Sequence, residues 1–384
     1  MLKMVLLFIL LLEKIDARFS KPNLRLLNSK KFLNLQETYG FLHKLSKLAP
    51  KSMELKKIGD TFIPGKDYEN DIFVVIIGNT SNPILFFDCG MHAREWISPA
   101  TCLYIIQKLV IVFETVRRTP FEHPVLDYQW QIAPMMNPDG YNKSHYDNRL
   151  QRKNGRPLNL MSGYDMKLNR GCLKSCKINP DECLGVDLNR NFPSGFGQGY
   201  ESFEIDSNLI CSDVYKGPTY LSEPETQALH NYILRIRKNI LSAISIHCYS
   251  MVISYPNGWM KKGDKNQVTG KDLNRFKSFV KTTNTFLNYK TGFVYEVFGE
   301  EGVSGGATDD YYYNYHDIKI SLTLELDPDS STSNGFVISP KKIIPIANKL
   351  WKTFQLIADK MKDFKEELME LNKRYEQKKL HPYV

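Results

Sequence analysis

Short apolar runs separated by polar turns predict the buried strands of a sheet along most of this chain. These runs lie at 72–77, 84–88, 128–133 and 241–246, and a further segment, 319–326, alternates between apolar and polar positions. A helix is predicted from Ser98 to about Val116, because Ser98 can cap it and Pro99 suits its first position. Strands interleaved with helices predict an α/β fold with a mixed, mostly parallel central sheet covered by helices on both faces.

The C-terminal part of the chain predicts one long helix, from about Lys341 to Lys379. Its apolar positions follow one another in steps of four and three, which is typical of an amphipathic helix that covers a core. Residues 362–384 are strongly charged and are interpreted as a helical extension. This extension either packs on the domain or projects and pairs with a helix of another molecule. We expect a monomer, with helix-mediated pairing as the alternative.

The N-terminal segment has the pattern of a secretory signal peptide. A lysine near the start precedes an apolar run, and a small residue at Ala17 offers a cleavage point. The run is shorter than the roughly 20 residues that a membrane-spanning helix needs. We therefore interpret 1–17 as a signal peptide, 18–32 as a short lead without a folded pro-domain, and 33–361 as one domain, and we expect an extracellular protein that is active as synthesised.

Composition and charge exclude several classes of protein. The chain has 384 residues, of which 42% are hydrophobic and 24% charged, as in globular proteins. Its mean hydropathy of -0.36 excludes a multispanning membrane protein, and no membrane span is expected. The net charge of +9 is spread along the chain without a basic block, so no nucleic-acid partner is expected.

Polar residues that could hold a metal follow three of the predicted strands. In a parallel sheet, ligands bind beyond the carboxyl ends of the strands. His92 and Glu95 are three residues apart after one strand, so a turn can direct both at one point, and His247 follows another strand. Glu325 lies near the end of a third. Three protein ligands with a fourth position left for water are typical of a catalytic zinc site.

Five motifs, in this order, resemble those of the zinc metallocarboxypeptidases of the carboxypeptidase A/B type. The resemblance covers residues 33 to 360 approximately. The motifs are His92-Ala-Arg-Glu95-Trp, Asn148-Arg149-Leu-Gln-Arg152-Lys, Gly185-Val-Asp187-Leu-Asn189-Arg190-Asn191, Ile246-His247-Cys-Tyr249-Ser and Thr323-Leu-Glu325-Leu.

The resemblance implies a zinc-dependent exopeptidase that hydrolyses the C-terminal bond of peptides or proteins. It implies one zinc ion per chain, held by His92, Glu95 and His247, the ligand set known from carboxypeptidase A itself. Glu325 would be the general base and acid for a zinc-activated water, and Arg152 would stabilise the oxyanion.

The same resemblance assigns residues around these groups. Asp187 would accept the second ring N–H of His92. Asn189 and Arg190 would hold the terminal carboxylate of the substrate, Arg190 through its two-pronged guanidinium. The remaining substrate-binding residues would be Arg94, Arg149 and Tyr249.

Two departures from the family pattern leave alternatives open. The tyrosine that caps the substrate in the family has Glu301 in its place, and Tyr295 is an alternative for that role. At the base of the specificity pocket, one alignment places Thr308 and predicts neutral side chains. The other places Asp309 and predicts substrates that end in Lys or Arg.

The seven cysteines are an odd number, so at least one thiol is unpaired. The resemblance implies the disulfides Cys89–Cys102 and Cys183–Cys211. Cys172 and Cys176 lie close together in an insertion and are expected to pair with each other. Cys248 is then left as a buried thiol.

Two other functions are compatible with this scaffold. An amidase or deacylase would share the zinc site, but the arginines and Asn189 favour peptide C-termini. A catalytically impaired member that binds peptides or zinc would be expected to have lost Glu325 or a ligand, and all of them are present.

Overall fold

The computed structural model describes residues 24, 26–27, 31–62, 68–115, 123–157, 185–199 and 207–380, with the side chains of 376–380 left out. Its described part contains one eight-stranded sheet. The strands are β1 (Met53–Asp60), β2 (Asp71–Ile77), β3 (Ile84–Cys89), β4 (Gln129–Ala133), β5 (Ile240–Ser250), β6 (Val252–Tyr255), β7 (Lys290–Phe293) and β8 (Ser321–Asp329). All five strands expected from the sequence are present, whereas β1, β6 and β7 were not predicted.

The sheet is mixed, with a parallel centre. Its order is β1-β2-β4-β3-β5-β8-β6-β7, and the four central strands β4, β3, β5 and β8 run parallel. β1, β2 and β4 pair antiparallel at one edge, and β6 runs antiparallel to β8 at the other. This confirms the predicted fold class.

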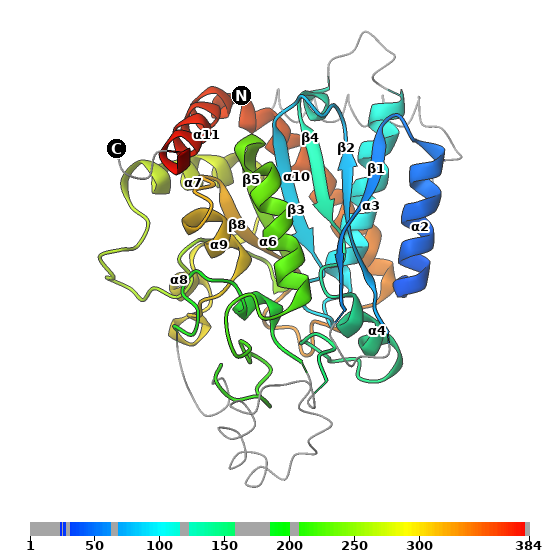
Figure 1. Cartoon of the computed structure of the whole chain (residues 1–384), viewed down its shortest axis with the longest axis horizontal. Coiled ribbons are helices and arrows are strands. Elements are labelled where there is room, and N and C mark those ends of the chain that lie inside the picture. Colours follow the sequence, from blue (N-terminus) through cyan, green and yellow to red (C-terminus); the bar gives the residue numbers. More distant parts are fainter. Residues whose placement is uncertain are drawn as a thin grey trace.

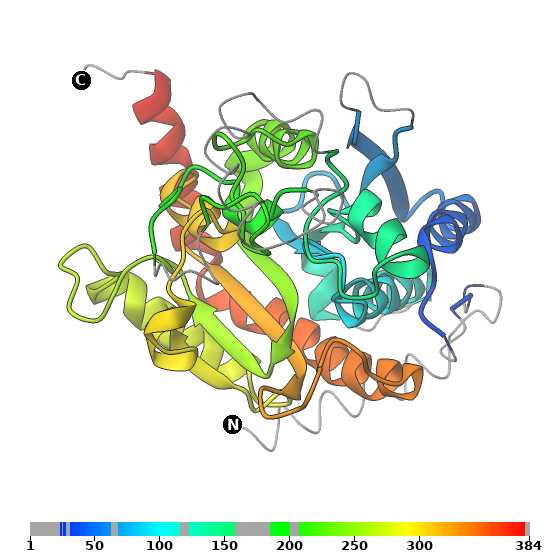
Figure 2. The same cartoon turned by 90° about the horizontal axis from the view of Figure 1, so that it is seen from below.

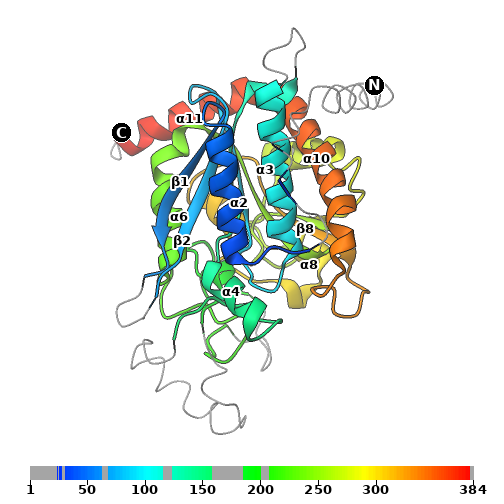
Figure 3. The ribbon, with the colours of Figure 1, turned by 90° about the vertical axis from the view of Figure 1, so that its right-hand side faces the viewer.

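Helices cover both faces of the sheet, as Figures 1 and 3 show. The helices α2, α3, α7 and α10 pack on one face, and α6 and α9 pack on the other. The helices are α2 (Leu35–Leu48), α3 (Ile97–Thr115), α4 (Pro138–Tyr146), α6 (Pro224–Ile236), α7 (Gly270–Thr283), α8 (Val294–Val297), α9 (Thr308–Asn314), α10 (Ile343–Lys360) and α11 (Lys365–Leu380).

Strands inside the sheet, such as β2, are apolar on both sides because both sides are covered. Val75 and Ile77 of β2 belong to the core beneath α3 and α10, whereas Val74 and Ile76 belong to the core beneath α6. Successive side chains of a strand point to opposite faces. A continuous apolar run is therefore what a strand between two helical layers requires.

The helix predicted from Ser98 begins one residue earlier, at Ile97, so the expected N-cap role of Ser98 is wrong. Ser98 Oγ instead accepts a hydrogen bond from Gly90 N and donates one to the carbonyl of Ile246. The hydroxyl thereby joins the turn after β3 to β5. By length and composition α3 could cross a bilayer. Within its most apolar 18-residue stretch, however, 89% is buried inside the domain, so α3 is a core helix.

The single long C-terminal helix predicted from the sequence is also wrong. The chain turns through a short 3-10 helix, Met361–Asp363, which separates α10 from α11. At the start of α11 Leu368 is buried against the core, and Arg275 pairs with Glu367 at 2.6 Å. The first turns of the extension therefore pack on the domain, while Figure 2 shows the end of α11, in red, reaching beyond it.

We predict that Asn372→Ala lowers the free energy of unfolding by about 1–3 kcal/mol, because the side chain is buried and satisfies main-chain groups. Asn372 Nδ2 donates to the carbonyls of Lys238 and Ile240, at 3.1 and 2.9 Å, and its Oδ1 accepts from Arg237 Nη1. Urea unfolding followed by circular dichroism measures the change. The exposed neighbour Lys373→Ala is the control, with an expected change below about 0.5 kcal/mol. Equal stabilities for the two variants would contradict the packing of α11.

The expected signal peptide and most of the lead lie outside the described residues. Within the lead, Leu24 is buried, and the backbone N–H groups of Leu26 and Leu27 donate to Gln107 Oε1 on α3 at 2.7 and 3.0 Å. The last part of the lead is thus attached to the core.

Candidate active site

The polar residues singled out in the sequence converge at the carboxyl ends of the parallel strands. β3 and β5 run side by side with Cys89 opposite Ile246, and β5 runs beside β8 with His247 opposite Glu325. The chain that follows β3 begins with the turn that carries His92 and Glu95. Because these strands end at the same edge, residues far apart in the sequence meet there.

His92, Glu95 and His247 form a compact cluster of potential metal ligands. One donor atom from each lies within 4.8 Å of the others, and all three residues are buried. Glu95 Oε1 lies 2.7 Å from His92 Nδ1, and Glu95 Oε2 lies 3.1 Å from His247 Nδ1. The two Nδ1 atoms are 3.2 Å apart. Two imidazoles and a carboxylate at such distances are a donor set that suits zinc.

Asp187 supports this cluster from behind. Its Oδ1 lies 3.1 Å from His92 Nε2, and its Oδ2 accepts from Arg152 Nε at 2.8 Å. It also accepts from Asn189 N at 2.9 Å. One carboxylate therefore orients a candidate ligand and the arginine expected to bind the oxyanion.

Opposite charges hold the buried carboxylates ionised. Burial alone would raise the pKa of Glu95, but the imidazoles of His92 and His247 lower it. Burial opposes ionisation of Asp187 as well, yet Arg152 and His92 hold its pKa well below the usual range. These carboxylates are therefore available as a ligand and as a hydrogen-bond acceptor at neutral pH.

Glu325 has a different environment. Burial first, and the Glu95 carboxylate second, raise its pKa to about 8. Within the described residues Glu325 Oε2 is buried and has no hydrogen-bond partner. A buried acceptor without a partner is costly, so this atom is expected to meet a group that is absent from the chain itself. The residues present thus fit a metal centre with a water beside it.

A cavity of about 450 Å³ opens over this cluster. It is within the size range of sites for small ligands. Its lining includes most of the predicted site residues and several that were not predicted: His92, Glu95, Arg152, Asn189, Arg190, Cys248, Tyr249, Ser254, Gly258, Val294, Phe298, Glu301, Gly302, Ser304, Ala307, Asp309, Asp310, Thr323, Glu325 and Phe336.

Asn189 and Arg190 lie in the cavity as candidates for binding a carboxylate. Asn189 Oδ1 accepts from Thr308 N at 3.0 Å and from Thr308 Oγ1 at 3.3 Å. Because a backbone N–H can only donate, these contacts identify the oxygen of the amide. The NH₂ group of Asn189 is then directed elsewhere and can donate to a ligand.

The contacts of Thr308 also bear on the open question about the pocket. Thr308 is fully buried against Asn189 and is not among the lining residues, whereas Asp309 and Asp310 are. Asp310 accepts from the backbone N–H groups of Asn257 and Gly258. Burial raises the pKa of Asp309 to about 6. Of the two residues that the alignments offer, Asp309 lines the cavity and Thr308 does not.

A close approach of Gly306 to the backbone of Arg190 positions the start of α9. Gly306 has φ of 79°, and a Cβ atom there would lie 2.2 Å from the carbonyl oxygen of Arg190. Only glycine fits such a contact and such a dihedral angle. The carboxylates of α9 therefore lie beside Arg190.

Of the three remaining residues expected to bind substrate, Arg94, Arg149 and Tyr249, only Tyr249 lines the cavity. It packs edge-to-face on Phe336, with ring centroids 4.8 Å apart. The Arg94 guanidinium lies over the ring of Phe336 and pairs with Asp213. The Arg149 guanidinium stacks on Trp96, 3.6 Å from the ring centroid. Arg149 also donates to the carbonyls of residues 94 and 336. Neither arginine is among the residues that line the cavity.

The loop that replaces the capping tyrosine lies at the cavity. Glu301, in the 3-10 helix Glu300–Gly302, is exposed and lines the opening. Tyr295 stacks on Phe293, with ring centroids 5.6 Å apart, and is not a lining residue. In the described part of the chain, Tyr249 is the tyrosine that faces the cavity.

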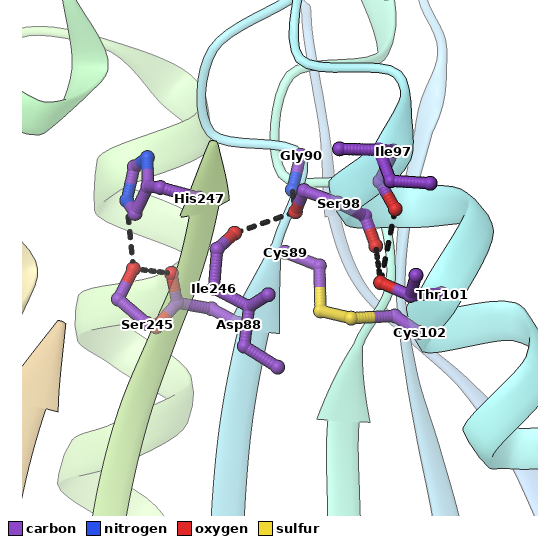
Figure 4. Close-up of a disulfide and its surroundings, with 10 residues drawn as sticks. All are labelled: Asp88, Cys89, Gly90, Ile97, Ser98, Thr101, Cys102, Ser245, Ile246 and His247. Atoms are coloured by element: carbon purple, nitrogen blue, oxygen red, sulfur yellow. Dashed lines mark hydrogen bonds between the residues drawn. A yellow bond between two sulfur atoms is a disulfide. The ribbon is translucent and has the colours of Figure 1, made fainter. Parts of the chain in front are cut away.

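The described cysteines include one disulfide pair and one free thiol. Cys89 and Cys102 are joined, which ties the end of β3 to α3 (Figure 4). Cys248 is free and buried, and its backbone N–H donates to Glu95 Oε2 at 3.1 Å. Cys211 is disulfide-bonded. The expected partner Cys183 and the expected pair Cys172–Cys176 lie outside the described residues.

Comparison with known proteins decides the family. The family model described as zinc carboxypeptidase matches residues 38–353, most of the chain. This chain belongs to the zinc carboxypeptidase family. It is accordingly a metallocarboxypeptidase, a peptide hydrolase.

Named zinc carboxypeptidases resemble it over most of its length. Zinc carboxypeptidase A 1 of Anopheles gambiae is 29% identical over 348 residues, which are 87% of this chain and 70% of the relative. Human carboxypeptidase A5 is 31% identical over 302 residues, 77% of this chain and 61% of the relative. Carboxypeptidase B of Astacus astacus is 28% identical over 330 residues, which are 83% of this chain and 94% of the relative. Relatives named A and B are similarly distant, so identity does not distinguish their specificities.

Solved structures of this family share the fold. Bovine thrombin-activatable fibrinolysis inhibitor, in complex with tick carboxypeptidase inhibitor, superposes with a TM-score of 0.69 at 25% identity, over 87% of this chain and 99% of that chain. Carboxypeptidase A from Helicoverpa armigera gives a TM-score of 0.69 at 24% identity, over 93% of this chain and 80% of that chain.

Several cavity residues of this zinc carboxypeptidase were not found from the sequence. Thr323 shares a face of β8 with Glu325, so the alternation of that strand could have indicated it. Phe336 and Ser254 lie in segments without a distinguishing pattern, and only the folded chain brings them to the cavity.

Proposed function

We propose that the chain is a secreted, zinc-dependent exopeptidase that removes the C-terminal residue of peptides or proteins, with a preference for Lys and Arg. The observation that supports it best is a cavity lined by His92 and Glu95 of the metal cluster, by Glu325 with its partnerless Oε2, and by Asn189 and Arg190. His247 completes the cluster directly behind this lining. Each chemical step of a carboxypeptidase has a suitable group there.

One zinc ion per chain would be held by the Nδ1 atoms of His92 and His247 and by Glu95. Zinc bound there would polarise the substrate carbonyl and lower the pKa of a water molecule to about 7. Glu325 would take the proton of the attacking water and return it to the leaving amine. Burial raises its pKa to about 8 in the metal-free protein, and a cation bound nearby would lower that pKa and favour the ionised form that a base requires. Arg152, oriented through its Nε by Asp187, donates to the developing oxyanion.

The carboxylate-binding residues restrict the reaction to chain ends. The Asn189 amide, oriented by Thr308, donates to the terminal carboxylate, and the Arg190 guanidinium adds charge-assisted hydrogen bonds. An internal peptide bond offers no carboxylate at this position. The same pair favours a peptidase over an amidase on the same metal centre.

The preference for basic residues rests on Asp309. This carboxylate is buried in the cavity wall, where an ion pair with a substrate ammonium or guanidinium is shielded from water. Val294 and Phe298, which also line the cavity, offer apolar contact to the methylene groups of Lys or Arg.

Secretion is supported by cysteine chemistry. Disulfides persist in oxidising compartments and are rare in the cytosol. Cys89, Cys102 and Cys211 are all disulfide-bonded. Together with the apolar N-terminal segment, this favours an extracellular protein.

A panel of blocked dipeptides that end in Lys, Arg, Phe or Glu tests the proposal. We expect hydrolysis of the Lys and Arg substrates at the highest kcat/KM, loss of all activity with a zinc chelator, and recovery on addition of zinc. Activity that is insensitive to the chelator would refute the zinc mechanism. Equal rates for Lys and Phe would refute only the preference.

A further inference from the structure

A chain of buried hydroxyl and carboxyl groups extends from His247 away from the metal cluster. His247 Nε2 lies 2.9 Å from Ser245 Oγ, and Ser245 Oγ lies 2.6 Å from Asp88 Oδ1, as Figure 4 shows. Tyr312 OH donates to the other oxygen, Asp88 Oδ2, at 2.9 Å. All four residues are between 0% and 1% exposed.

The Asp88 end of this hydrogen-bonded series sets the direction of the hydrogen bonds within it. Burial raises the pKa of Asp88, and the hydrogen bonds from Ser245 and Tyr312 oppose this rise. Both hydroxyls donate, Ser245 to Oδ1 and Tyr312 to Oδ2, so Asp88 is an acceptor on both of its oxygens. Ser245 Oγ is then left as an acceptor towards His247, and the hydrogen between them must belong to His247 Nε2. His247 Nε2–H therefore donates to Ser245 Oγ, and the Ser245 hydroxyl donates to Asp88.

This order decides which nitrogen of His247 is free to bind a cation. With the proton on Nε2, the lone pair is on Nδ1, and Nδ1 is the atom that faces Glu95 and His92. Were Ser245 to donate to Nε2 instead, a neutral ring would carry its proton on Nδ1, where it would block the metal site. The other histidine of the cluster has a simpler arrangement, since His92 Nε2 meets Asp187 directly.

We propose that Asp88 is a positioning residue, which acts through the Ser245 hydroxyl to hold His247 in the tautomer and orientation required for metal binding. The inference rests on the proposed function, because it assumes that His247 is a zinc ligand. It extends that function to two residues that have no part in the chemistry and that lie on different strands. Asp88 is on β3 and Ser245 is on β5, so the pairing of these strands brings the carboxylate to the histidine.

Zinc affinity of Ser245→Ala and Asp88→Asn, measured by competition with a chromophoric chelator, tests the inference. We expect Ser245→Ala to bind zinc about 10- to 100-fold more weakly, the usual effect of removing a group that orients a metal-bound histidine. Asp88→Asn can donate as well as accept, so it allows both bond directions, and we expect a loss of about 10-fold. The visible absorption of the cobalt-substituted protein should change in both variants.

Two matched variants separate orientation of the ligand from a general loss of packing. Ser242→Ala removes a hydroxyl from the same strand, and Ser242 Oγ is buried and has no hydrogen-bond partner in the described part of the chain. Tyr312→Phe removes a hydrogen bond to Asp88 but leaves the Ser245 contact. Both should bind zinc within about threefold of the unmodified protein, with an unchanged cobalt spectrum.

The outcomes distinguish this inference from the proposed function. If the unmodified protein binds zinc and hydrolyses C-terminal residues while Ser245→Ala binds zinc equally tightly, only the role of the Asp88–Ser245 pair is refuted. A Tyr312→Phe or Ser242→Ala variant that weakens zinc as much as Ser245→Ala also refutes it, since packing would then explain the effect. An unmodified protein that binds no zinc refutes both.

Discussion

Replacement of Glu325 by Gln is expected to lower kcat by about 10²- to 10⁴-fold with little change in zinc content, the range assigned to loss of a general acid or base. The amide keeps the size of the side chain but cannot take up a proton from water at neutral pH. Since Glu325 is not among the three clustered donors, the metal should remain bound. The measurement is steady-state hydrolysis of a blocked dipeptide ending in Lys, together with elemental analysis of the purified variant.

Glu300→Gln is the matched control for this substitution. Glu300 carries the same charge, lies in the exposed loop beside Glu301, and is not a lining residue of the cavity. Its substitution should leave kcat within about twofold. A Glu325→Gln variant that keeps a third or more of the activity would contradict the role of Glu325 as the proton carrier.

Replacement of Asp309 by Asn is expected to lower kcat/KM for substrates ending in Lys or Arg by about 100-fold, the usual scale for truncating one partner of a buried charge pair. A substrate ending in Phe has no charge for Asp309 to pair with, so its kcat/KM should change by less than about threefold. The ratio of the two values, measured on the same preparation, is independent of the fraction of active protein.

The pH dependence of this ratio follows from the raised pKa of Asp309, which is about 6 in the free protein. Above that pH the group is a carboxylate and attracts a cation, and below it the group is neutral. The preference for Lys over Phe should therefore fall as the pH decreases from 7 to 5. In Asp309→Asn the preference should be low and constant over the same range.

The neighbouring carboxyl group provides the comparison. Asp310 is held by the backbone N–H groups of Asn257 and Gly258, so Asp310→Asn should affect Lys and Phe substrates alike. If Asp310→Asn alone abolished the preference, or if Asp309→Asn left it intact, the assignment of the pocket would be wrong. Thr308 would then regain its place as the alternative, although its hydroxyl and N–H both bind Asn189.

The sequence by itself determined the sheet and the metal cluster. Apolar runs located β2, β3, β4 and β5 because a strand covered on both faces needs apolar side chains on both. Alternation of apolar and polar positions located β8. The three-residue spacing of His92 and Glu95, with His247 at the end of a later strand, indicated the cluster because parallel strands end at one edge of a sheet. The resemblance to carboxypeptidases supplied the roles.

The tertiary structure decided what local pattern leaves undetermined. The apolar spacing of the C-terminal helix continues through Met361–Asp363, and only the contacts of Leu368 and Asn372 with the core explain the turn there. Counting along the chain could not show that Thr308 packs against Asn189 while Asp309 lines the cavity, because such contacts depend on how distant segments pack together. Nor could it pair Asp88 with Ser245, since hydrogen bonds between strands depend on register, and register is fixed when the whole sheet packs.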